Sequence, residues 1–169
     1  MELVRPSKKY EQSFMEAVDE YMAEGRSYEA LVLEEQGSFE GMVQYYTDME
    51  QGINLPKGYV PATEFWLVEG DKFIGRLSIR HQLNDYLTTF GGHIGYAIRP
   101  SERKKGYGSK ALELGLLEAK KLGINKILIT CNNTNIGSRK IIEKNGGVFE
   151  DERPKEGEAP IRRYWITID

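Results

Sequence analysis

The sequence predicts a single α/β domain built around a mixed β-sheet, and three observations support that fold class. The chain has 169 residues, a length that fits one compact core. Apolar residues recur at helical spacing in the first part of the chain and change to strand-like runs from Glu64 onward. Residues 93–131 are typical of a strand, a helix and a second strand, which form a right-handed crossover with parallel strands. The other strands are joined by hairpins, so the sheet is expected to be largely antiparallel.

The first part of the chain is expected to supply one strand and two helices. Residues 2–5 are strand-like, and Ser7 can cap a helix that ends at Gly25. Ser38 caps a second helix, which ends before Gly52 and is followed by a loop rich in glycine and proline. Both helices carry apolar residues at helical spacing and are expected to cover the sheet.

The rest of the chain supplies the sheet. Hairpin turns, β-branched runs and helix caps predict the following elements in order: a β-hairpin over residues 65–79, a loop over 82–92, a strand over 93–99, a helix over 107–122, a strand over 126–131, a short helix from Asn135 to Gly146, and strands near 148–150 and 161–168. No repeat or linker interrupts this order, so residues 1–169 are expected to form one domain.

Composition excludes several classes of protein. Cys131 is the only cysteine, so an internal disulfide is impossible, and His81 and His93 match no zinc-binding spacing. No metal site is therefore expected. No apolar run has the length that spans a bilayer, and the first residues have neither a basic leader nor an apolar signal core. We expect a soluble, cytoplasmic protein without nucleic-acid or membrane partners.

Charge is distributed unevenly along the chain. The net charge is −3, yet residues 1–60 carry 5 Lys/Arg and 12 Asp/Glu, whereas residues 61–169 carry 18 and 14. A solvated surface would account for this asymmetry, which concerns partners rather than the fold. A functional interpretation needs a motif within the basic part.

Residues 100–110 supply that motif. They lie between an expected strand and an expected helix and include the basic residues 103–105, directly before Gly106 and Gly108. The glycines allow a tight turn and a close approach of backbone N–H groups to a ligand. The new helix adds free N–H donors and the positive end of its dipole. This segment predicts a binding site for a di- or polyphosphate.

Two phosphate motifs were considered for this segment. Gly106, Gly108 and Ala111 satisfy the dinucleotide fingerprint, which would indicate a nucleotide-dependent oxidoreductase. The glycines follow their strand too late for that motif, however, and lie past the middle of the chain. Asn132 and Asn133 also stand where an acidic ribose ligand is expected. A Walker loop is absent.

The segment resembles a different family. Arg103-Lys104-Lys105-Gly106-Tyr107-Gly108 matches the (Gln/Arg)-x-x-Gly-x-(Gly/Ala) signature of the GNAT superfamily of N-acetyltransferases, which also follows a strand that ends in proline. The block from Asn135 to Gly146 resembles the family's Asn-led helix that ends in a glycine turn. The order of elements resembles the GNAT fold over essentially the whole chain, which implies a splayed central pair of parallel strands with flanking helices.

The resemblance implies that acetyl-CoA is the cofactor. In this family the signature loop binds the pyrophosphate through backbone N–H groups, the preceding strand pairs with the pantetheine arm, and the Asn-led helix contacts the region of the thioester. The matching positions here are Ala97, Ile98, Arg99, Arg103, Lys104, Lys105, Gly106, Tyr107, Gly108, Ser109, Asn135 and Ser138. Capping of the helix is an alternative role for Asn135.

The implied reaction is direct transfer of an acetyl group to a primary amine in a ternary complex. Some relatives use a glutamate as base at the position of Gly92, and the neighbouring His93 is the best-suited titratable group here. Tyr96 is expected to face the same side of the sheet and to position the substrate. Ile142 occupies the position where many relatives place a tyrosine acid, and Cys131 is expected to be a core residue.

The acceptor is expected near the first two helices and the loop over residues 82–92. It is a small-molecule or peptide amine, and the acidic excess of these helices suggests a cationic one; replacing the glutamates of residues 29–50 would then raise its KM. Many relatives dimerise, which makes a homodimer an open alternative to a monomer. Because Ile142 replaces the tyrosine, a non-catalytic acyl-CoA sensor of the same fold is the competing function.

Overall fold

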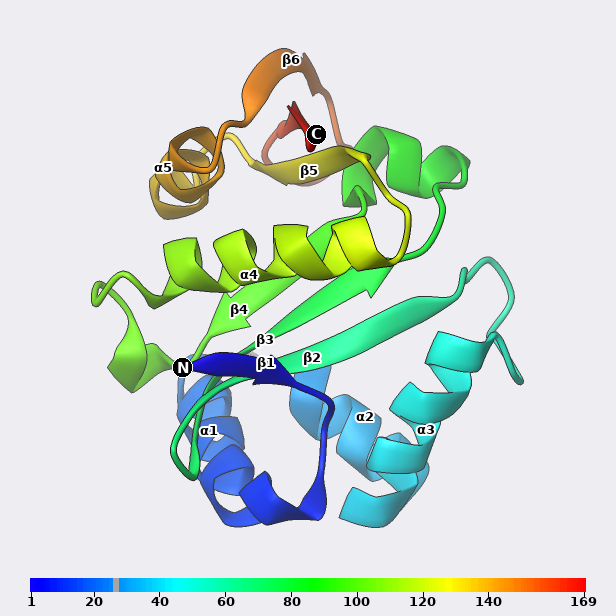
Figure 1. Ribbon diagram of the computed structural model, residues 1–169, viewed down its shortest axis with the longest axis vertical. Helices are drawn as coiled ribbons and strands as arrows, with labels where there is room; N and C mark the ends of the chain where they lie inside the picture. Colours follow the sequence, from blue (N-terminus) through cyan, green and yellow to red (C-terminus); the bar gives the residue numbers. More distant parts are fainter. Residues whose placement is uncertain (26–27) are drawn as a thin grey trace.

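The computed structural model describes residues 1–25 and 28–169, and its framework is one seven-stranded sheet (Figure 1). The strands lie in the order β1-β2-β3-β4-β5-β7-β6. Their bounds are Glu2–Val4 for β1, Ala62–Glu69 for β2, Lys72–Arg80 for β3, Ile94–Ile98 for β4, Lys126–Asn132 for β5, Val148–Arg153 for β6 and Ile161–Thr167 for β7. The sheet predicted from the sequence is confirmed, with each strand shifted by a few residues at most.

One pair of strands in this sheet is parallel. β4 and β5 run in the same direction, and every other neighbouring pair is antiparallel. The register between β4 and β5 consists of Ile94 opposite Ile129 alone. The two strands therefore part beyond Ile94, and the expected splay at the centre of the sheet is confirmed.

Helices cover both faces of the sheet (Figure 1). The helices α1 (Glu11–Ala23), α2 (Tyr28–Gln36) and α3 (Phe39–Gln51) lie on one face, whereas α4 (Tyr107–Lys121) and α5 (Ile136–Lys144) lie on the other. The sequence predicted α1, α3, α4 and α5 but not α2. A short π-helix at Leu87–Gly91 also forms inside the segment expected to be a loop. Among the described residues, no helix combines the length and the apolarity needed to cross a bilayer.

The sheet separates two apolar layers. On the side of α1–α3, Trp66 stacks on Phe14 with ring centroids 4.6 Å apart. On the side of α4, Leu77 and Ile79 pack beneath the helix, and a Cβ at Gly115 would lie 2.6 Å from Leu77 Cδ1. Glycine at this position therefore lets α4 approach the sheet closely.

The helix caps follow the sequence in two of three cases. Ser38 Oγ accepts a hydrogen bond from the N–H of Gly41 at 3.0 Å, and Asn135 Oδ1 accepts one from Ser138 at 3.0 Å. The expected cap at Ser7 is wrong, because Ser7 precedes a 3₁₀ turn at Lys8–Tyr10 and its side chain makes no capping bond. α1 therefore begins three residues later than a cap at Ser7 implies, at Glu11.

Candidate active site

The gap between β4 and β5 is the centre of the site. Hydrogen bonds from Arg80 N–H to His93 and from Arg99 N–H to Ile74 fix which residues of β4 face β3. Along an antiparallel strand, the backbone N–H and C=O groups of successive residues point alternately to one side and to the other. The backbone groups of Gly95 and Ala97 therefore point to β3, and those of Tyr96 and Ile98 point to the gap. Beyond Ile94 the edge of β4 thus offers backbone donors and acceptors that β5 does not pair with.

The first turn of α4 lies beside this edge. Gly106 has φ +87° and precedes the helix without a side-chain cap, so the first N–H groups of α4 are free to bind a ligand. A Cβ at Gly108 would lie 2.6 Å from Ile141 Cδ1 and 3.7 Å from Ile98 Cγ1. Gly106 is thus required for its left-handed backbone, whereas Gly108 eases the close packing of α4 against Ile98 and Ile141.

The three basic residues before the glycines do not act alike. Arg103 Nη1 contacts both carboxylate oxygens of Glu24, at 2.9 and 2.8 Å, and its Nε donates to the carbonyl of Ile98 at 3.1 Å. Lys105 pairs with Glu102. Lys104 forms no ion pair within residues 1–25 and 28–169, and its φ of 63° places it in the turn itself. Of these three basic residues, only Lys104 is therefore without an ion pair in the described part of the chain, because Arg103 and Lys105 pair with Glu24 and Glu102.

Arg99 turns away from the gap towards α1. Its Nε donates to Glu20 at 2.7 Å, and its Nη2 lies 3.3 Å from Glu16. Burial alone would raise the pKa of Glu20, but hydrogen bonds from Ser101 and Arg99 outweigh it, and the pKa lies below its ordinary value. The Arg99 side chain is therefore a structural link between β4 and α1, and Ala97 likewise packs on the side of α1–α3. Neither side chain therefore reaches the gap, and the backbone groups of both residues point to β3, so the cofactor contacts expected at these two positions find no support in the geometry.

Tyr96 and Ser138 meet at the gap from distant parts of the sequence. The Tyr96 hydroxyl and Ser138 Oγ are 2.8 Å apart, and Asn135 fixes Ser138 by capping α5. Burial raises the pKa of Tyr96 to about 12, so its hydroxyl keeps its proton at neutral pH. Tyr96 packs into the layer of α4 and α5. The expectation that it faces the same side as His93 is wrong, because residues three apart in a strand lie on opposite faces.

His93 is held in a way that opposes its expected role. The N–H of Leu128 donates to His93 Nδ1 at 3.0 Å, and the ring is buried. A neutral imidazole has one acceptor nitrogen, and here a backbone donor occupies it. Burial and the charge of Arg80 also lower the pKa of His93. The geometry therefore assigns His93 to the junction of β4 and β5 and does not support a general base.

Cys131 and Ile142 are core residues. Burial raises the pKa of the Cys131 thiol to about 11, so it stays protonated. Ile142 is completely buried, and a Cβ at Gly147 would lie 2.4 Å from its Cγ2. The glycine turn after α5 is needed for this packing. Ile142 supplies no proton donor, whereas Tyr96 of β4 brings a hydroxyl to the N-terminal end of α5, where it meets Ser138.

A cavity of about 530 Å³ opens on the side of α1–α3, a size that suits a small organic ligand. We call it the tyrosine pocket. It lies between α2, α3, the loop over residues 58–60, the face of β2 and β3, and the start of the π-helix. Five tyrosines line it, namely Tyr28, Tyr45, Tyr46, Tyr59 and Tyr86. It therefore occupies the region where the sequence predicted the acceptor.

Three charged side chains line this pocket: Glu64, Arg76 and Arg80. Arg76 Nε and Nη2 donate to the two oxygens of Glu64 at 2.7 and 2.9 Å, and the ring of Tyr28 lies 4.6 Å from the Arg76 guanidinium carbon. Burial raises the pKa of Glu64, and the charge of Arg76 opposes that rise. Glu29 is 3.9 Å from Arg76.

The lining does not carry the acidic excess that the sequence suggested. The acids of the first helices are paired elsewhere, for example Glu50 with Arg5 and Glu40 with Lys8. Glu24 and Glu20 hold the arginines that flank the phosphate-binding turn. Glu20 and Glu24 of the acidic part thus pair with Arg99 and Arg103 of the basic part, whereas Glu40 and Glu50 pair within the acidic part.

Sequence reasoning missed the charged floor of the pocket. The signal was present in β3, where Leu77 and Ile79 alternate with Arg76, Ser78 and Arg80. In a central strand, such alternation predicts one apolar and one polar face. A polar face beneath helices indicates a ligand pocket rather than a core.

Comparisons with known proteins agree with this architecture. A family model described as an acetyltransferase (GNAT) domain matches residues 40–148. A sequence comparison with curated proteins gives no significant match.

Solved structures resemble the whole chain at low sequence identity. An acetyltransferase from Salmonella typhimurium that modifies the N-terminal serine of ribosomal protein L7/L12 is 18% identical, with a TM-score of 0.68 over 99% of this chain and 94% of that one. The microcin C7 self-immunity acetyltransferase MccE, in complex with acetyl-CoA and AMP, is also 18% identical, with a TM-score of 0.72 over 98% and 91%. The spermidine N-acetyltransferase SpeG of Vibrio cholerae is 17% identical, with a TM-score of 0.56 over 77% and 75%.

The family match covers well over half of the chain and includes the splayed strands, the glycine turn and the whole of the Asn-capped helix. The chain therefore belongs to the GNAT family of acetyltransferases.

Proposed function

We propose that the protein transfers the acetyl group of acetyl-CoA to the amine of an acceptor bound in the tyrosine pocket. The observation that carries the proposal is the break between β4 and β5, beside which the uncapped first turn of α4 begins. One ligand can use both features, since an extended arm would pair with the edge of β4 and a pyrophosphate would meet the N–H groups of α4. Bound acetyl-CoA supplies an activated thioester.

The residues of the turn would bind the phosphates by their main chain. Gly106 and Gly108 set the path of the backbone, and the N–H groups of Tyr107, Gly108 and Ser109 are the donors at the start of α4. Lys104 adds a positive charge. The backbone groups of Tyr96 and Ile98 would pair with the pantetheine arm, and their N–H groups are suited to stabilise an oxyanion near the thioester.

The acceptor would approach from the opposite face of the sheet. Glu64, Ser78 and Gly95 lie side by side on β2, β3 and β4, as the strand registers show. Adjacent strands are about 4.8 Å apart, so Glu64 lies about 10 Å from the backbone of Gly95. That span accommodates an amine and a water, through which the buried carboxylate can take up the proton that the amine loses.

Tyr96 would serve the other end of the reaction. Its hydroxyl lies on the side of α4 and α5, bonded to Ser138, and stays protonated because its pKa is about 12. It can therefore donate a proton to the departing thiolate. This assignment replaces the substrate-positioning role expected from the sequence and fills the place that Ile142 leaves without a donor.

A matched pair of glycine variants tests the proposal. Gly106 and Gly123 flank α4, have φ of +87° and +78°, and have no atom within 4 Å of an added Cβ. Valine at either position imposes the same kind of backbone strain. We expect Gly106→Val to abolish CoA binding in calorimetry and thiol release from acetyl-CoA with an amine panel, whereas Gly123→Val retains both.

Three results would contradict the proposal. CoA binding without turnover on any amine would favour the acyl-CoA sensor. Stabilisation by NAD rather than CoA in a thermal shift would favour a nucleotide-dependent oxidoreductase. Equal CoA affinity in the Gly106→Val and Gly123→Val variants would show that the turn before α4 does not bind the phosphates.

A further inference from the structure

The tyrosine pocket contains a cation, Arg80, that forms no direct ion pair with a carboxylate of the described residues. Arg80 Nη1 donates to the carbonyl oxygens of Gly91 and Gly92, at 3.0 and 3.2 Å. Across residues 1–25 and 28–169, no Asp or Glu forms an ion pair with Arg80. The one acid of the lining, Glu64, is held by both oxygens on Arg76. Glu29 adds a second buried carboxylate 3.9 Å from Arg76. Arg80 is therefore the one charged side chain of the described lining without a direct carboxylate partner, although the nearby charge of Glu64 acts on it.

The positive charge of Arg80 is partly withdrawn from solvent. Burial lowers the pKa of Arg80, and the neighbouring charge of Arg76 lowers it further. A guanidinium nevertheless stays protonated at neutral pH, so the group must bear its charge. The two carbonyl dipoles on Nη1 compensate the charge only in part. The other N–H groups of the fork suit the two oxygens of a carboxylate or phosphate.

Arg80 also lies close to the reacting edge of the sheet. A Cβ at Gly95 would be 3.6 Å from both Nη1 and Nη2, so the guanidinium lies over Gly95 on β4. Arg76, Ser78 and Arg80 share one face of β3 and all line the pocket. An anion bound by Arg80 would consequently sit within the length of a small molecule from the gap beside β4.

We propose that the acceptor is an amine that also carries an oxyanion, a carboxylate or a phosphate, and that Arg80 binds this group. The inference rests on the proposed function and narrows its substrate class. It replaces the cationic acceptor suggested by the sequence, because Glu40 and Glu50 lie in ion pairs outside the pocket and Glu29 lies beside Arg76.

Matched acceptors separate the oxyanion from the rest of the molecule. Tyrosine and tyrosinamide differ in a carboxylate, O-phosphoethanolamine and ethanolamine differ in a phosphate, and spermidine represents a polycation. The measurement is kcat/KM for thiol release from acetyl-CoA. In the unmodified protein we expect the anionic member of at least one pair to exceed its neutral partner by about tenfold or more, as a charge-assisted pair allows. A difference in kcat/KM within the tyrosine pair would indicate a carboxylate, and a difference within the ethanolamine pair would indicate a phosphate.

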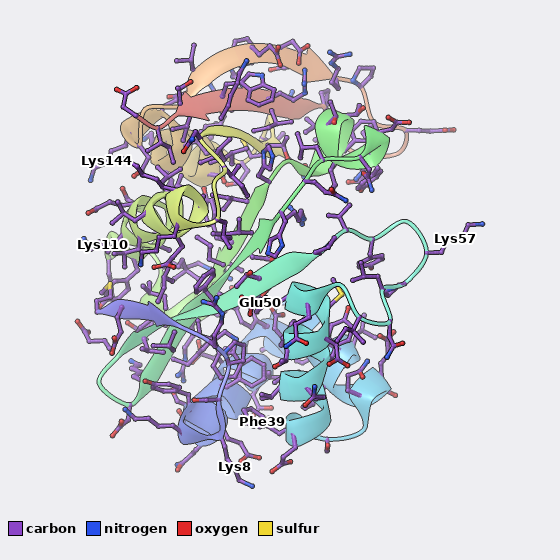
Figure 2. The ribbon with its side chains drawn as sticks, turned by 45° about the vertical axis from the view of Figure 1, so that its right-hand side comes forward. Lys8, Phe39, Glu50, Lys57, Lys110 and Lys144 are labelled. Atoms are coloured by element: carbon purple, nitrogen blue, oxygen red, sulfur yellow. The ribbon has the colours of Figure 1, made fainter. Side chains whose placement is uncertain are left out.

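Two variants assign the preference to Arg80. Arg80→Gln should reduce it to about twofold or less while the neutral acceptor keeps its kcat/KM, and Arg80→Lys should keep part of it, since a point charge remains. Lys57→Gln is the matched control. Lys57 belongs to the loop beside the pocket, but its side chain points away from the body of the molecule (Figure 2), and its removal should leave the preference unchanged.

Each outcome decides the inference. Two outcomes would overturn the inference. One is a preference for the anionic acceptor that survives in Arg80→Gln. The other is a higher kcat/KM for spermidine and the neutral amines than for both anionic acceptors in the unmodified protein. If no amine is acetylated, the proposed function fails, and calorimetry with the same compounds on the CoA-saturated protein decides the inference separately. Tighter binding of the anionic members, lost in Arg80→Gln and kept in Lys57→Gln, would uphold it, and equal binding would overturn it. If Arg80→Gln does not fold, Arg80→Lys and the acceptor pairs carry the test.

Discussion

Replacing Glu64 by leucine should destabilise the protein strongly, because Arg76 would remain buried without its main partner. Arg76 donates two hydrogen bonds to Glu64, at 2.7 and 2.9 Å, and the exposed fractions of the two side chains are 16% and 4%. Removing one member of such a pair costs about 3–5 kcal/mol, most of it the penalty for an uncompensated buried charge.

Glu29 places the expected loss at the lower end of that range. Its carboxylate lies 3.9 Å from Arg76, and it would remain in the variant. Two unit charges at that distance attract by about 4 kcal/mol at an effective dielectric constant of about 20, before the cost of desolvation. We therefore expect Glu64→Leu to lower the unfolding free energy by about 3 kcal/mol, or the melting temperature by about 6–12 °C for a chain of this size.

The reciprocal and double variants make this a thermodynamic cycle. Arg76→Met should cost less than Glu64→Leu, because a stranded carboxyl can take up a proton whereas a guanidinium cannot lose one. The double variant should lie within about 1 kcal/mol of the unmodified protein, since an apolar pair needs no charge compensation. Urea denaturation followed by the fluorescence of the buried Trp66 measures all three. A loss below about 1 kcal/mol for Glu64→Leu, or a double variant equal to the sum of the singles, would refute the reasoning.

Four further substitutions test other parts of the protein. A Cβ at Gly75 would lie 2.5 Å from a backbone carbonyl of β4, so Gly75→Ala should lower the unfolding free energy by about 2–3 kcal/mol and weaken CoA binding. A Cβ at Gly95 would meet only the flexible end of an arginine side chain, so Gly95→Ala should leave the urea midpoint nearly unchanged. Tyr96→Phe should lower kcat about 100-fold with little change in the acceptor KM, and because the pKa of Tyr96 is about 12, steady-state rates should show no loss of this donor below about pH 10. An equal kcat in the phenylalanine variant would remove Tyr96 from the chemistry. The pKa of Glu20 lies below its ordinary value of 4.5, so the ionised carboxylate contributes its full stabilisation above pH 4.5 and loses it as the pH falls through the lowered pKa. The urea midpoints of the unmodified protein and of Glu20→Gln should therefore converge at low pH. A difference between the two midpoints that stays constant down to about pH 2 would contradict this prediction.

The sequence predicted the sheet well because its strands carry strong local signals. β5 is an apolar, β-branched run, and β2 and β3 flank a Gly-Asp turn, so both types of strand are visible without tertiary information. The glycines of the phosphate-binding turn were equally visible, since their backbone demands are local. Gly106 has the positive φ that its place in the motif predicts.

The parts that the sequence could not supply depend on partners distant in the chain. α2 carries four adjacent apolar residues, of which Leu31 is 50% exposed while Val32 is buried, so helical periodicity gave no signal. The pairing of Arg103 with Glu24 spans 79 positions, and that of Tyr96 with Ser138 spans 42. His93 seemed suited to catalysis by composition, and only the position of the Leu128 N–H shows that its acceptor nitrogen is occupied.

A sheet whose centre is joined by one backbone pair is weak there in shear. β1–β4 with α1–α3 form one leaf and β5–β7 form another, and side-chain packing under α4 and α5 joins them where backbone hydrogen bonds do not. Packing contacts tolerate small sliding better than a hydrogen-bond ladder does, so the two leaves can shift against each other while each stays intact. A ligand bound along the edge of β4 would supply backbone-like hydrogen bonds between the two parts of the sheet, and these would be lost when the ligand dissociates. Cofactor concentration would then set the rigidity of the whole protein as well as its rate of turnover.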